Sequence, residues 1–260
     1  MIGLGAMSRD LRSSLKLAGG EFDVAAALVQ PGDSYKFHGE TGMEIFHDPM
    51  ELVEWKPSLV VECAGHSAVR DAVPLLLRRG IDTVIASIGS LADPDLLHDL
   101  EEAAAAGNSR LTVVSGAIGG LDALRAAKLA GLESVQYVGR KPPLAWKGSP
   151  AEDMCDLSQI TEPLTFFAGT AEDAARLFPK NANVTAAVAL AGVGFRDTTV
   201  ALIADPTATL NSHQVDARGA FGDFTICLRN APLPDNPKTS RLAALSVQQA
   251  VVRHFDHVDF

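Results

Sequence analysis

The chain has 260 residues, 47% of them hydrophobic and 21% charged, which is ordinary for a globular protein with one large or two modest domains. It contains no apolar run near the ~18–20 residues of a membrane span, and its net charge of −10 argues against nucleic acid or anionic membrane as a partner. Three cysteines without metal or redox spacing favour a reducing compartment, so we expect a cytoplasmic protein without a bound metal.

The chain opens with MIGLGAMSRDL, in which GLGAMS has the form of a dinucleotide-binding glycine turn. Gly3 would permit the tight bend, Gly5 would let a pyrophosphate approach, and the helix begun by Ala6 and Met7 would offer N–H groups to the phosphates. Ser8 replaces the third glycine of this fingerprint, and two glycines alone often form only a turn. Because two residues precede Gly3, we expect that the natural strand begins upstream or that a neighbouring segment fills the gap.

The first half of the chain alternates short apolar runs with helical patterns. Strands buried on both faces are predicted at 23–29, 58–64, 82–87 and 111–115. Helices are predicted at 67–79, with Ser67 as N-cap, and at 93–106. Such alternation indicates βαβ units and a parallel sheet, which binds ligands at the carboxyl ends of its strands.

The second strand of such a unit usually ends in an acidic residue that binds the ribose 2′-hydroxyl. Here the strand is followed by Gln30, which carries no charge to repel a 2′-phosphate, and Arg9, Arg12 and Lys36 are candidate neighbours. The alternative is that Asp33 binds the hydroxyl instead. We therefore expect a site that accepts both NAD and NADP.

The segment SGAIGGLDALRAA, residues 115–127, places three glycines between a strand and a helix. The chain is expected to cross from one domain to the other here, so its backbone can line a nicotinamide site. An ordinary strand–helix turn explains the same residues equally well.

The pattern changes after about residue 120. Further strands are predicted at 134–139, 199–204, 209–217 and 223–229, the last with clean alternation of apolar and polar residues. Helices are predicted at 171–178 with Thr170 as cap, at 183–192 and at 239–255. These elements indicate an α+β second domain whose sheet has one open face.

His213 lies in the predicted strand TLNSHQVDARG, on the same face as Thr209, Asn211 and Val215. That mixture of polar and apolar residues suits a pocket wall, and histidine is the side chain best suited to move a proton near neutral pH. Most strand histidines are nevertheless structural. His66, which follows a predicted strand end, is the rival candidate.

Two further segments combine small and polar residues at predicted helix starts. In FPKNANV, Asn181 or Asn183 is either an N-cap or an amide available to the cofactor or substrate. In NPKTS, Lys238, Thr239 and Ser240 either begin the last helix or bind a substrate carboxylate.

Taken together, the chain resembles the L-aspartate dehydrogenase family of NAD biosynthesis. The resemblance rests on segments that run in family order over almost the whole chain: GLGAMS, SIGSLAD, SGAIGGLDAL, RKPP, FPKNANV, DPTATLNSHQV, GAFGDF and NPKTS. It implies that His213 is the catalytic histidine and that the GLGA turn, Ala117 and Asn183 contact the cofactor. It also implies a homodimer. Family members usually have glycine in place of Ser8 and a full first strand.

We therefore predict a Rossmann-type dinucleotide-binding domain, residues 1–118 joined by the C-terminal helix 239–260, and a substrate and dimerisation domain, residues 119–238. The expected reaction is NAD(P)-dependent oxidative deamination of L-aspartate to iminoaspartate, which water converts to oxaloacetate and ammonia. Two alternatives stay open. One is a related dehydrogenase or reductase of another small carboxylic acid, and the other is a cofactor-binding homologue without turnover.

Overall fold

The structure is a computed structural model that describes residues 1–17, 22–32, 42–233 and 236–258. The chain forms two compact units, Met1–Val114 with Ala244–Phe260, and Ser115–Ala243. The first unit is therefore discontinuous in sequence. No helix within the described ranges is long and apolar enough to cross a bilayer.

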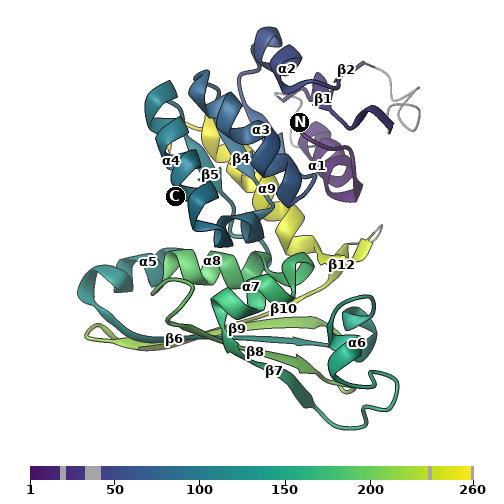
Figure 1. The fold of residues 1–260 in the computed structure, drawn as a ribbon, viewed down its shortest axis with the longest axis vertical. Helices are drawn as coiled ribbons and strands as arrows, with labels where there is room; N and C mark the ends of the chain where they lie inside the picture. The colour runs from purple at the N-terminus through teal and green to yellow at the C-terminus, as the bar shows by residue number, and fades with distance from the viewer. Residues whose placement is uncertain (18–21, 33–41, 234–235, 259–260) are drawn as a thin grey trace. The chain divides into compact units, whose positions relative to one another are not determined.

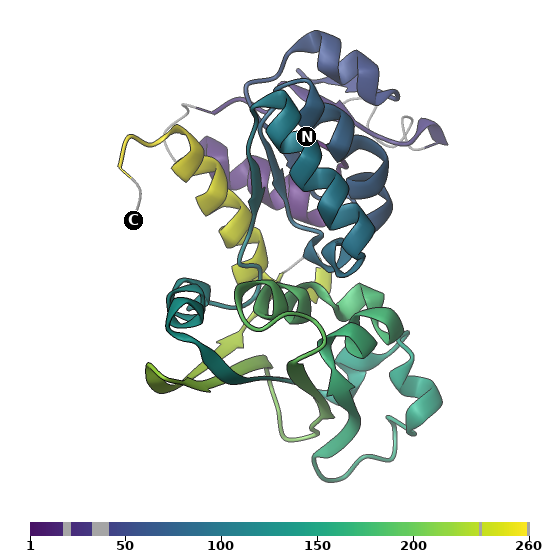
Figure 2. The same cartoon turned by 60° about the vertical axis from the view of Figure 1, so that its left-hand side comes forward.

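The first unit contains a parallel sheet between two layers of helices. Its strands run in the order β2-β1-Ile2-β3-β4-β5, with Ile2 forming single bridges to Leu28 and Glu62, and this is the order of a dinucleotide-binding sheet. Figures 1 and 2 show α3 and α4 on one face and α1 and α9 on the other. The strands are β1 (Ala26–Leu28), β2 (Glu44–Phe46), β3 (Val60–Glu62), β4 (Thr83–Ile85) and β5 (Leu111–Val113), and the helices are α1 (Ala6–Leu17), α2 (Pro49–Trp55), α3 (His66–Arg78), η2 (Ile88–Ala92), α4 (Pro94–Gly107) and α9 (Arg241–Phe255).

The short N-terminal segment occupies the central position of this sheet. The Ile2 N–H donates to Val61 O at 2.8 Å, and Ile2 O accepts from Cys63 N at 3.0 Å. On the other side, Leu28 N donates to Met1 O at 2.8 Å and Gly3 N donates to Leu28 O at 2.9 Å. Residues 1–3 thus pair with both neighbouring strands, which gives partners to backbone groups of β1 and β3 that face them.

The predicted starts of α3 and α9 are wrong. Helix α9 begins at Arg241 and not at residue 239, because residues 239 and 240 belong to a short strand. The N-cap position of α3 is Gly65, and Ser67 lies inside the first turn. The cause is the buried Glu62 carboxylate, whose Oε1 accepts from Ala64 N and Gly65 N at 2.7 Å each and turns the chain earlier. By contrast, Asp93 caps α4 by accepting from Asp95 N and Leu96 N, and Thr170 caps α7 as predicted.

The second unit is a five-stranded mixed sheet in the order β10-β9-β6-β8-β7, in which only β6 and β8 pair in parallel. Figure 1 shows α5, α7 and α8 on one face of it. The strands are β6 (Leu132–Lys141), β7 (Leu164–Thr170), β8 (Thr198–Ala204), β9 (Asn211–Gly219) and β10 (Gly222–Asn230), followed by the small pair β11 (Pro232–Leu233) and β12 (Asn236–Ser240); the helices are α5 (Leu121–Ala130), η3 (Pro143–Trp146), α6 (Ala151–Met154), α7 (Ala171–Leu177), η4 (Pro179–Asn181) and α8 (Asn183–Ala191).

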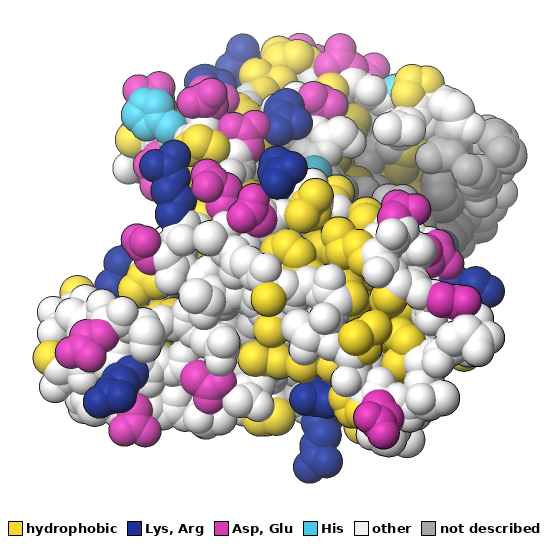
Figure 3. Space-filling view, turned by 60° about the horizontal axis from the view of Figure 1, so that its bottom comes forward, with side chains coloured by type: hydrophobic (Ala, Val, Ile, Leu, Met, Phe, Trp, Pro, Cys, Tyr) yellow, Lys and Arg dark blue, Asp and Glu magenta, His cyan; other side chains and the backbone are white. Residues whose placement is uncertain are grey.

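Alternation along these strands separates a covered face from an open face. On β9, Asn211, His213, Val215 and Ala217 are buried, whereas the residues between them are half-buried. No helix of the described residues covers the other face in Figure 1, and Figure 3 shows hydrophobic side chains gathered over part of it with charged groups around them. The expected open-faced sheet is therefore present.

Candidate functional site

In the first unit, the GLGAMS segment forms a tight turn between Ile2 and α1. Gly3 has φ of +83°, and a Cβ there would lie 2.8 Å from the Cβ of Ala64, so only glycine fits. At Gly5, by contrast, no neighbouring atom lies within 4 Å of an added Cβ. Ser8 is buried and its hydroxyl donates to Gly3 O at 2.9 Å, so the residue that replaces the third glycine closes the turn.

Glu62 links this turn to the adjacent strand ends. Its carboxylate is fully buried and accepts from Ala64 N, Gly65 N, Ser87 N and the Ser87 hydroxyl, at 2.7 to 3.1 Å. Four donors satisfy the buried charge, which would otherwise be strongly unfavourable. The carboxylate thereby holds Ala64 in the position that Gly3 requires.

A cavity of about 650 Å³ lies beside the turn at the carboxyl ends of the strands. Its lining includes Gly3, Gly5, Arg9, Gln30 and Asp71. The volume is within the range of small-molecule and cofactor sites, and the open space at Gly5 suits the close approach of a pyrophosphate. The residues therefore fit a dinucleotide. Ala6 and Met7 begin α1 directly after the turn, whereas Asp33 and Lys36 lie outside the described residues.

In the second unit, His213 lies buried on β9 with 4% of its surface exposed. Its Nδ1 is 2.8 Å from the hydroxyl of Tyr137 on β6, and the two rings stack with centroids 6.0 Å apart. Among the described residues, the imidazole of His213 makes no hydrogen bond other than this one through Nδ1. Its Nε2 is thus left for another partner, which is the arrangement expected of a histidine that exchanges a proton.

Gly139 makes this hydrogen bond possible. It pairs with His213 across β6 and β9, and a Cβ on it would lie 2.8 Å from the Tyr137 hydroxyl oxygen and 3.1 Å from Leu202 Cδ2. The missing side chain leaves room for the phenol of Tyr137, two residues earlier on the same face, to reach His213.

Lys141 ends β6 on the same covered face and has 9% of its surface exposed. Its ammonium donates to Asn181 Oδ1 at 3.1 Å and lies 4.6 Å from the centre of the Trp146 ring. Trp146 is held in turn by its indole N–H, which donates to Ile203 O at 3.0 Å. A positive charge is thus fixed near His213 by an amide and an aromatic ring.

Burial sets the protonation of these groups. Burial, with a smaller contribution from the charge of Lys141, lowers the pKa of His213 to about 3. Burial lowers the pKa of Lys141 to about 8 and raises the pKa of Tyr137. At neutral pH the imidazole is therefore neutral, Tyr137 keeps its proton and Lys141 is mostly charged.

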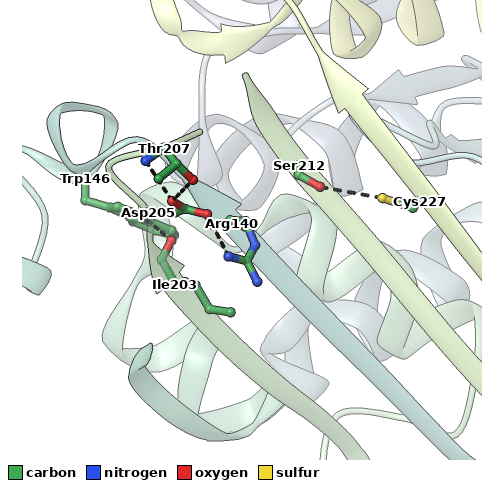
Figure 4. A network of polar contacts seen from close by, with 7 residues as sticks. All are labelled: Arg140, Trp146, Ile203, Asp205, Thr207, Ser212 and Cys227. Carbon is green, nitrogen blue, oxygen red and sulfur yellow. Dashed lines mark hydrogen bonds and ion pairs between the residues drawn. The ribbon is translucent and has the colours of Figure 1, made fainter. Parts of the chain in front are cut away.

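Figure 4 shows that the carboxylate of Asp205, which follows the residue paired with Lys141, is bonded to Arg140 and Thr207. The Asp205 N–H donates to Lys141 O, but its carboxylate accepts from Arg140 Nη1 at 2.7 Å and from the Thr207 hydroxyl at 2.6 Å. The hydrogen bonds from Thr207 and then Arg140 lower the pKa of Asp205 to about 2. Arg140 belongs to the open face, so this ion pair lies apart from the covered face that carries His213. Figure 4 also shows the contact of Ser212 with Cys227 on the open face.

Other predicted residues lie at the same end of the sheet. Asn230 pairs with Asn211, and its side-chain amide donates to Ala117 O at 2.7 Å, which fixes the SGAIGG segment there. Ser240 pairs with Pro232, two residues beyond Asn230, and its buried hydroxyl has no hydrogen-bond partner in the described part of the chain. Thr239 precedes Ser240 in β12.

The remaining candidate residues from the sequence are the two asparagines near α8, Lys238 and His66. Neither Asn181 nor Asn183 caps α8, because Ala182 is the N-cap and makes no side-chain capping bond. The backbone of Lys238 lies in β12, but its side chain is outside the described residues. His66 begins α3 in the first unit, so it shares no sheet end with His213.

Comparison with known proteins finds a matching family model for each of the two units. A family model described as "Aspartate dehydrogenase, C-terminal" matches residues 122–254, and one described as "Homoserine dehydrogenase, NAD binding domain" matches residues 3–114. The L-aspartate dehydrogenase of Polaromonas sp. strain JS666 is 45% identical over 257 residues, covering 97% of this chain and 95% of that protein. The chain belongs to the L-aspartate dehydrogenase family.

Other L-aspartate dehydrogenases extend the likeness. That of Ralstonia nicotianae is 52% identical over 196 residues, covering 75% of this chain and 73% of that protein. The crystal structure of aspartate dehydrogenase from Thermotoga maritima superposes with a TM-score of 0.76 at 24% identity, over 100% of this chain and 97% of that one. At this identity the structural likeness supports the fold.

Sequence reasoning missed three buried residues on the sheet face that carries His213. Tyr137 and Lys141 lie on the buried face of β6, and Asn230 ends β10. RKPP, which contains Lys141, helped to identify the family, but no local pattern showed that its lysine faces the same side of the sheet as His213. Only the pairing of β6 with β9 shows that.

Proposed function

We propose that the protein catalyses NAD(P)-dependent oxidative deamination of L-aspartate, with the first unit binding the dinucleotide and the second binding the substrate. The observation that carries this proposal is the buried imidazole of His213, bonded through Nδ1 to Tyr137 and accompanied by the buried side chain of Lys141, in a chain of the L-aspartate dehydrogenase family. L-Aspartate has two carboxylates and an ammonium, so its oxidation requires both a proton acceptor and local positive charge.

The residues proposed to hold the cofactor are Gly3, Gly5, Ala6 and Met7 for the phosphates. Ala117 and Asn183 are proposed for the nicotinamide end. The glycine turn, the open space at Gly5 and the adjoining cavity support the first group. When bound, the nicotinamide supplies the acceptor for the hydride lost by the substrate α-carbon.

His213 is proposed to accept the proton of the substrate ammonium or of the water that attacks the imine. For this role Nδ1 carries the hydrogen and donates it to the Tyr137 oxygen, so that Nε2 keeps its lone pair. The low pKa of His213, caused first by burial and then by Lys141, keeps the imidazole unprotonated before substrate binds. A substrate carboxylate near Lys141 would offset the second cause and make the imidazole a stronger base.

The substrate pocket is further proposed to include Ser240, with Thr239 and Lys238 beside it in the same strand. The buried hydroxyl of Ser240, which lacks a partner among the described residues, supports its part in this proposal because such groups normally bind a protein group, a water or a ligand.

Both NAD and NADP are proposed as cofactors, because Gln30 lines the cavity where an acidic residue would repel a 2′-phosphate. Values of kcat/KM measured with each cofactor test this. A preference for NAD above about 1,000-fold, which corresponds to about 4 kcal/mol, would show that another group such as Asp33 reads the hydroxyl.

The function itself is tested by following the absorbance of the reduced nicotinamide with L-aspartate and with other amino and hydroxy acids. We expect L-aspartate-dependent reduction that His213→Ala lowers roughly 10²–10⁴-fold in kcat with little change in cofactor affinity. His66→Ala, made in parallel, should stay near the unmutated rate. Turnover of a different acid would favour the related dehydrogenase, and cofactor binding without turnover would favour a non-catalytic homologue.

A homodimer in the cytoplasm is also proposed. The open face of the β6–β10 sheet supports the dimer because hydrophobic side chains gather there without a covering helix among the described residues. Cys63, Cys155 and Cys227 are all free thiols, which supports a reducing compartment.

A further inference from the structure

Lys141 is a buried cation for which the described residues provide no counter-ion. Its ammonium has an amide oxygen and an aromatic ring as partners, and no carboxylate in the described ranges forms an ion pair with it. A buried charge is normally paired, because transfer from water to a protein interior is strongly unfavourable. An ammonium that has no carboxylate partner among the described residues points to an anionic ligand as its counter-ion.

The neighbouring side chains leave the ammonium available to an anion. Asp205, the acidic residue closest in the strand pairing, is fully engaged with Arg140 and Thr207. Asn181 accepts one of the three ammonium hydrogens, and Trp146 lies against the charge without using its own N–H, which is bonded to Ile203 O. The side chain is thus held in place while hydrogen-bonding capacity remains for a ligand oxygen.

The position of Lys141 relates this charge to the proposed base. Lys141 lies on the covered face of β6, two residues after Gly139. Gly139 is paired with His213 on the neighbouring strand β9. Lys141 is thus a diagonal neighbour of His213 in an antiparallel pair of strands, and such neighbours lie about 7–8 Å apart, a distance that a four-carbon diacid can span. The net charge of −10 repels a dianion from the molecule as a whole, so a local cation is needed.

We propose that Lys141 is a specificity-determining residue whose ammonium binds one carboxylate of the dicarboxylate substrate beside His213. The inference rests on the proposed function, since it names the residue that recognises the substrate in the same site. If Lys141 had only a structural role, its replacement by a long apolar residue would lower the stability of the protein. If Lys141 serves to bind a ligand, the same replacement should leave the ligand-free protein equally stable or more stable, because a buried charge without a counter-ion is removed.

The test compares Lys141→Met with a matched control, Lys147→Met, which removes an exposed lysine from the same segment. Binding of succinate, a diacid without a reacting amine, is measured by calorimetry with and without NAD. We expect Lys141→Met to weaken succinate binding at least 30-fold and to melt at the same or a higher temperature than the unmutated protein. Lys147→Met should bind succinate normally. A second variant, Lys141→Arg, retains the charge and should keep part of the affinity.

Kinetics then identify which carboxylate is bound. If Lys141 binds the side-chain carboxylate, Lys141→Met lowers kcat/KM for L-aspartate far more than for L-asparagine, whose side chain is neutral. If it binds the α-carboxylate, both substrates lose equally. Either result supports a carboxylate-binding lysine.

The proposal is overturned if Lys141→Met binds succinate as tightly as the unmutated protein, if the unmutated protein does not bind succinate at all, or if Lys141→Met melts lower while succinate affinity is intact. These outcomes differ from failure of the proposed function. In that case the unmutated protein lacks L-aspartate-dependent reduction of NAD or NADP, whatever the behaviour of Lys141→Met toward succinate.

Discussion

Two buried bases that differ in charge lie on one face of the sheet in the second unit. His213 is neutral and Lys141 mostly positive at neutral pH, because burial disfavours the charged form of each but starts from different ordinary pKa values. The same burial links both groups to stability. Their folded-state pKa values are lowered, so the unfolded chain binds more protons, and stability rises with pH between the folded and unfolded values.

For His213 that window runs from about pH 3, the folded value, to about pH 6.5, the unfolded value. We expect His213→Gln, whose amide can still meet Tyr137, to lose less stability on acidification than the unmutated protein. The difference should reach about 3 kcal/mol between about pH 7.5 and pH 4, because Gln takes up no proton on unfolding. Denaturant unfolding at both pH values measures it, and parallel pH dependence in the two proteins would contradict a neutral buried imidazole.

Tyr137 is a positioning residue whose hydroxyl fixes the imidazole. We expect Tyr137→Phe to lower kcat by roughly 10–100-fold with a smaller change in KM for aspartate, because the ring of His213 loses the partner that orients it. Stability should fall by about 1–2 kcal/mol, since Nδ1 is left buried without a partner.

A purely structural role for Tyr137 would lower the melting temperature without separating kcat from KM. Ser212→Ala, on the opposite face of β9, is the matched control and should change neither kinetic constant.

At the scale of elements, substitutions in the turn between Ile2 and α1 can distinguish the structural role of Gly3 from the phosphate-binding role proposed for Gly5. Gly3→Ala should unfold the protein or destabilise it by several kcal/mol, because φ is +83° and the new Cβ meets Ala64. Gly5→Ala meets no atom of the protein, so the fold should persist while NADH affinity, measured by fluorescence, falls at least tenfold. Equal NADH binding by Gly5→Ala and the unmutated protein would show that no phosphate approaches this turn.

Elements with strong local signals were predicted from sequence. Strands β1, β3 and β4, which are buried as predicted, together with α3, α4, α7 and the alternating β10, follow from periodicity and caps that act within a few residues. Strand β5 lies where a strand was predicted, but its residues are half-buried or exposed, so the prediction of burial on both faces is wrong there. Strand β2, helix α2 and strand β7 were missed. Strand β2 has three residues, α2 has seven, and β7 contains a bulge between Thr165 and Phe167 that breaks its alternation.

The site was predicted less completely than the fold because its chemistry depends on strand pairing. His213 was found from a local pattern and from family resemblance. Its place in a strand is confirmed, and its place in the wall of a pocket stays a prediction. Lys141 and Tyr137 contribute only through the register of β6 with β9, which joins residues about 75 positions apart. Sequence patterns of a single strand carry no information on that register.

At the scale of the whole molecule, the open sheet face predicts the association state. We expect Val138→Asp, in the central strand of this face, to convert the proposed dimer to a monomer, because a carboxylate buried at the proposed two-fold interface would lack a partner. Sedimentation velocity measures the mass. Leu129→Asp, on the well-exposed outer side of α5, is the control and should leave the mass unchanged. A monomeric unmutated protein would contradict the proposed dimer.

The discontinuous first unit has a consequence for synthesis. Helix α9 supplies Val247, Ala250 and Val251 to the core of a unit whose other residues end at Val114. On the ribosome, residues 1–114 emerge before the rest of their core and lack α9 until residues 241–255 have emerged, whereas the second unit is continuous and all of its chain is available earlier. The nucleotide-binding unit is therefore the last to reach its final packing, and nascent chains that end before Ala244 should depend on chaperones to protect its exposed apolar surface.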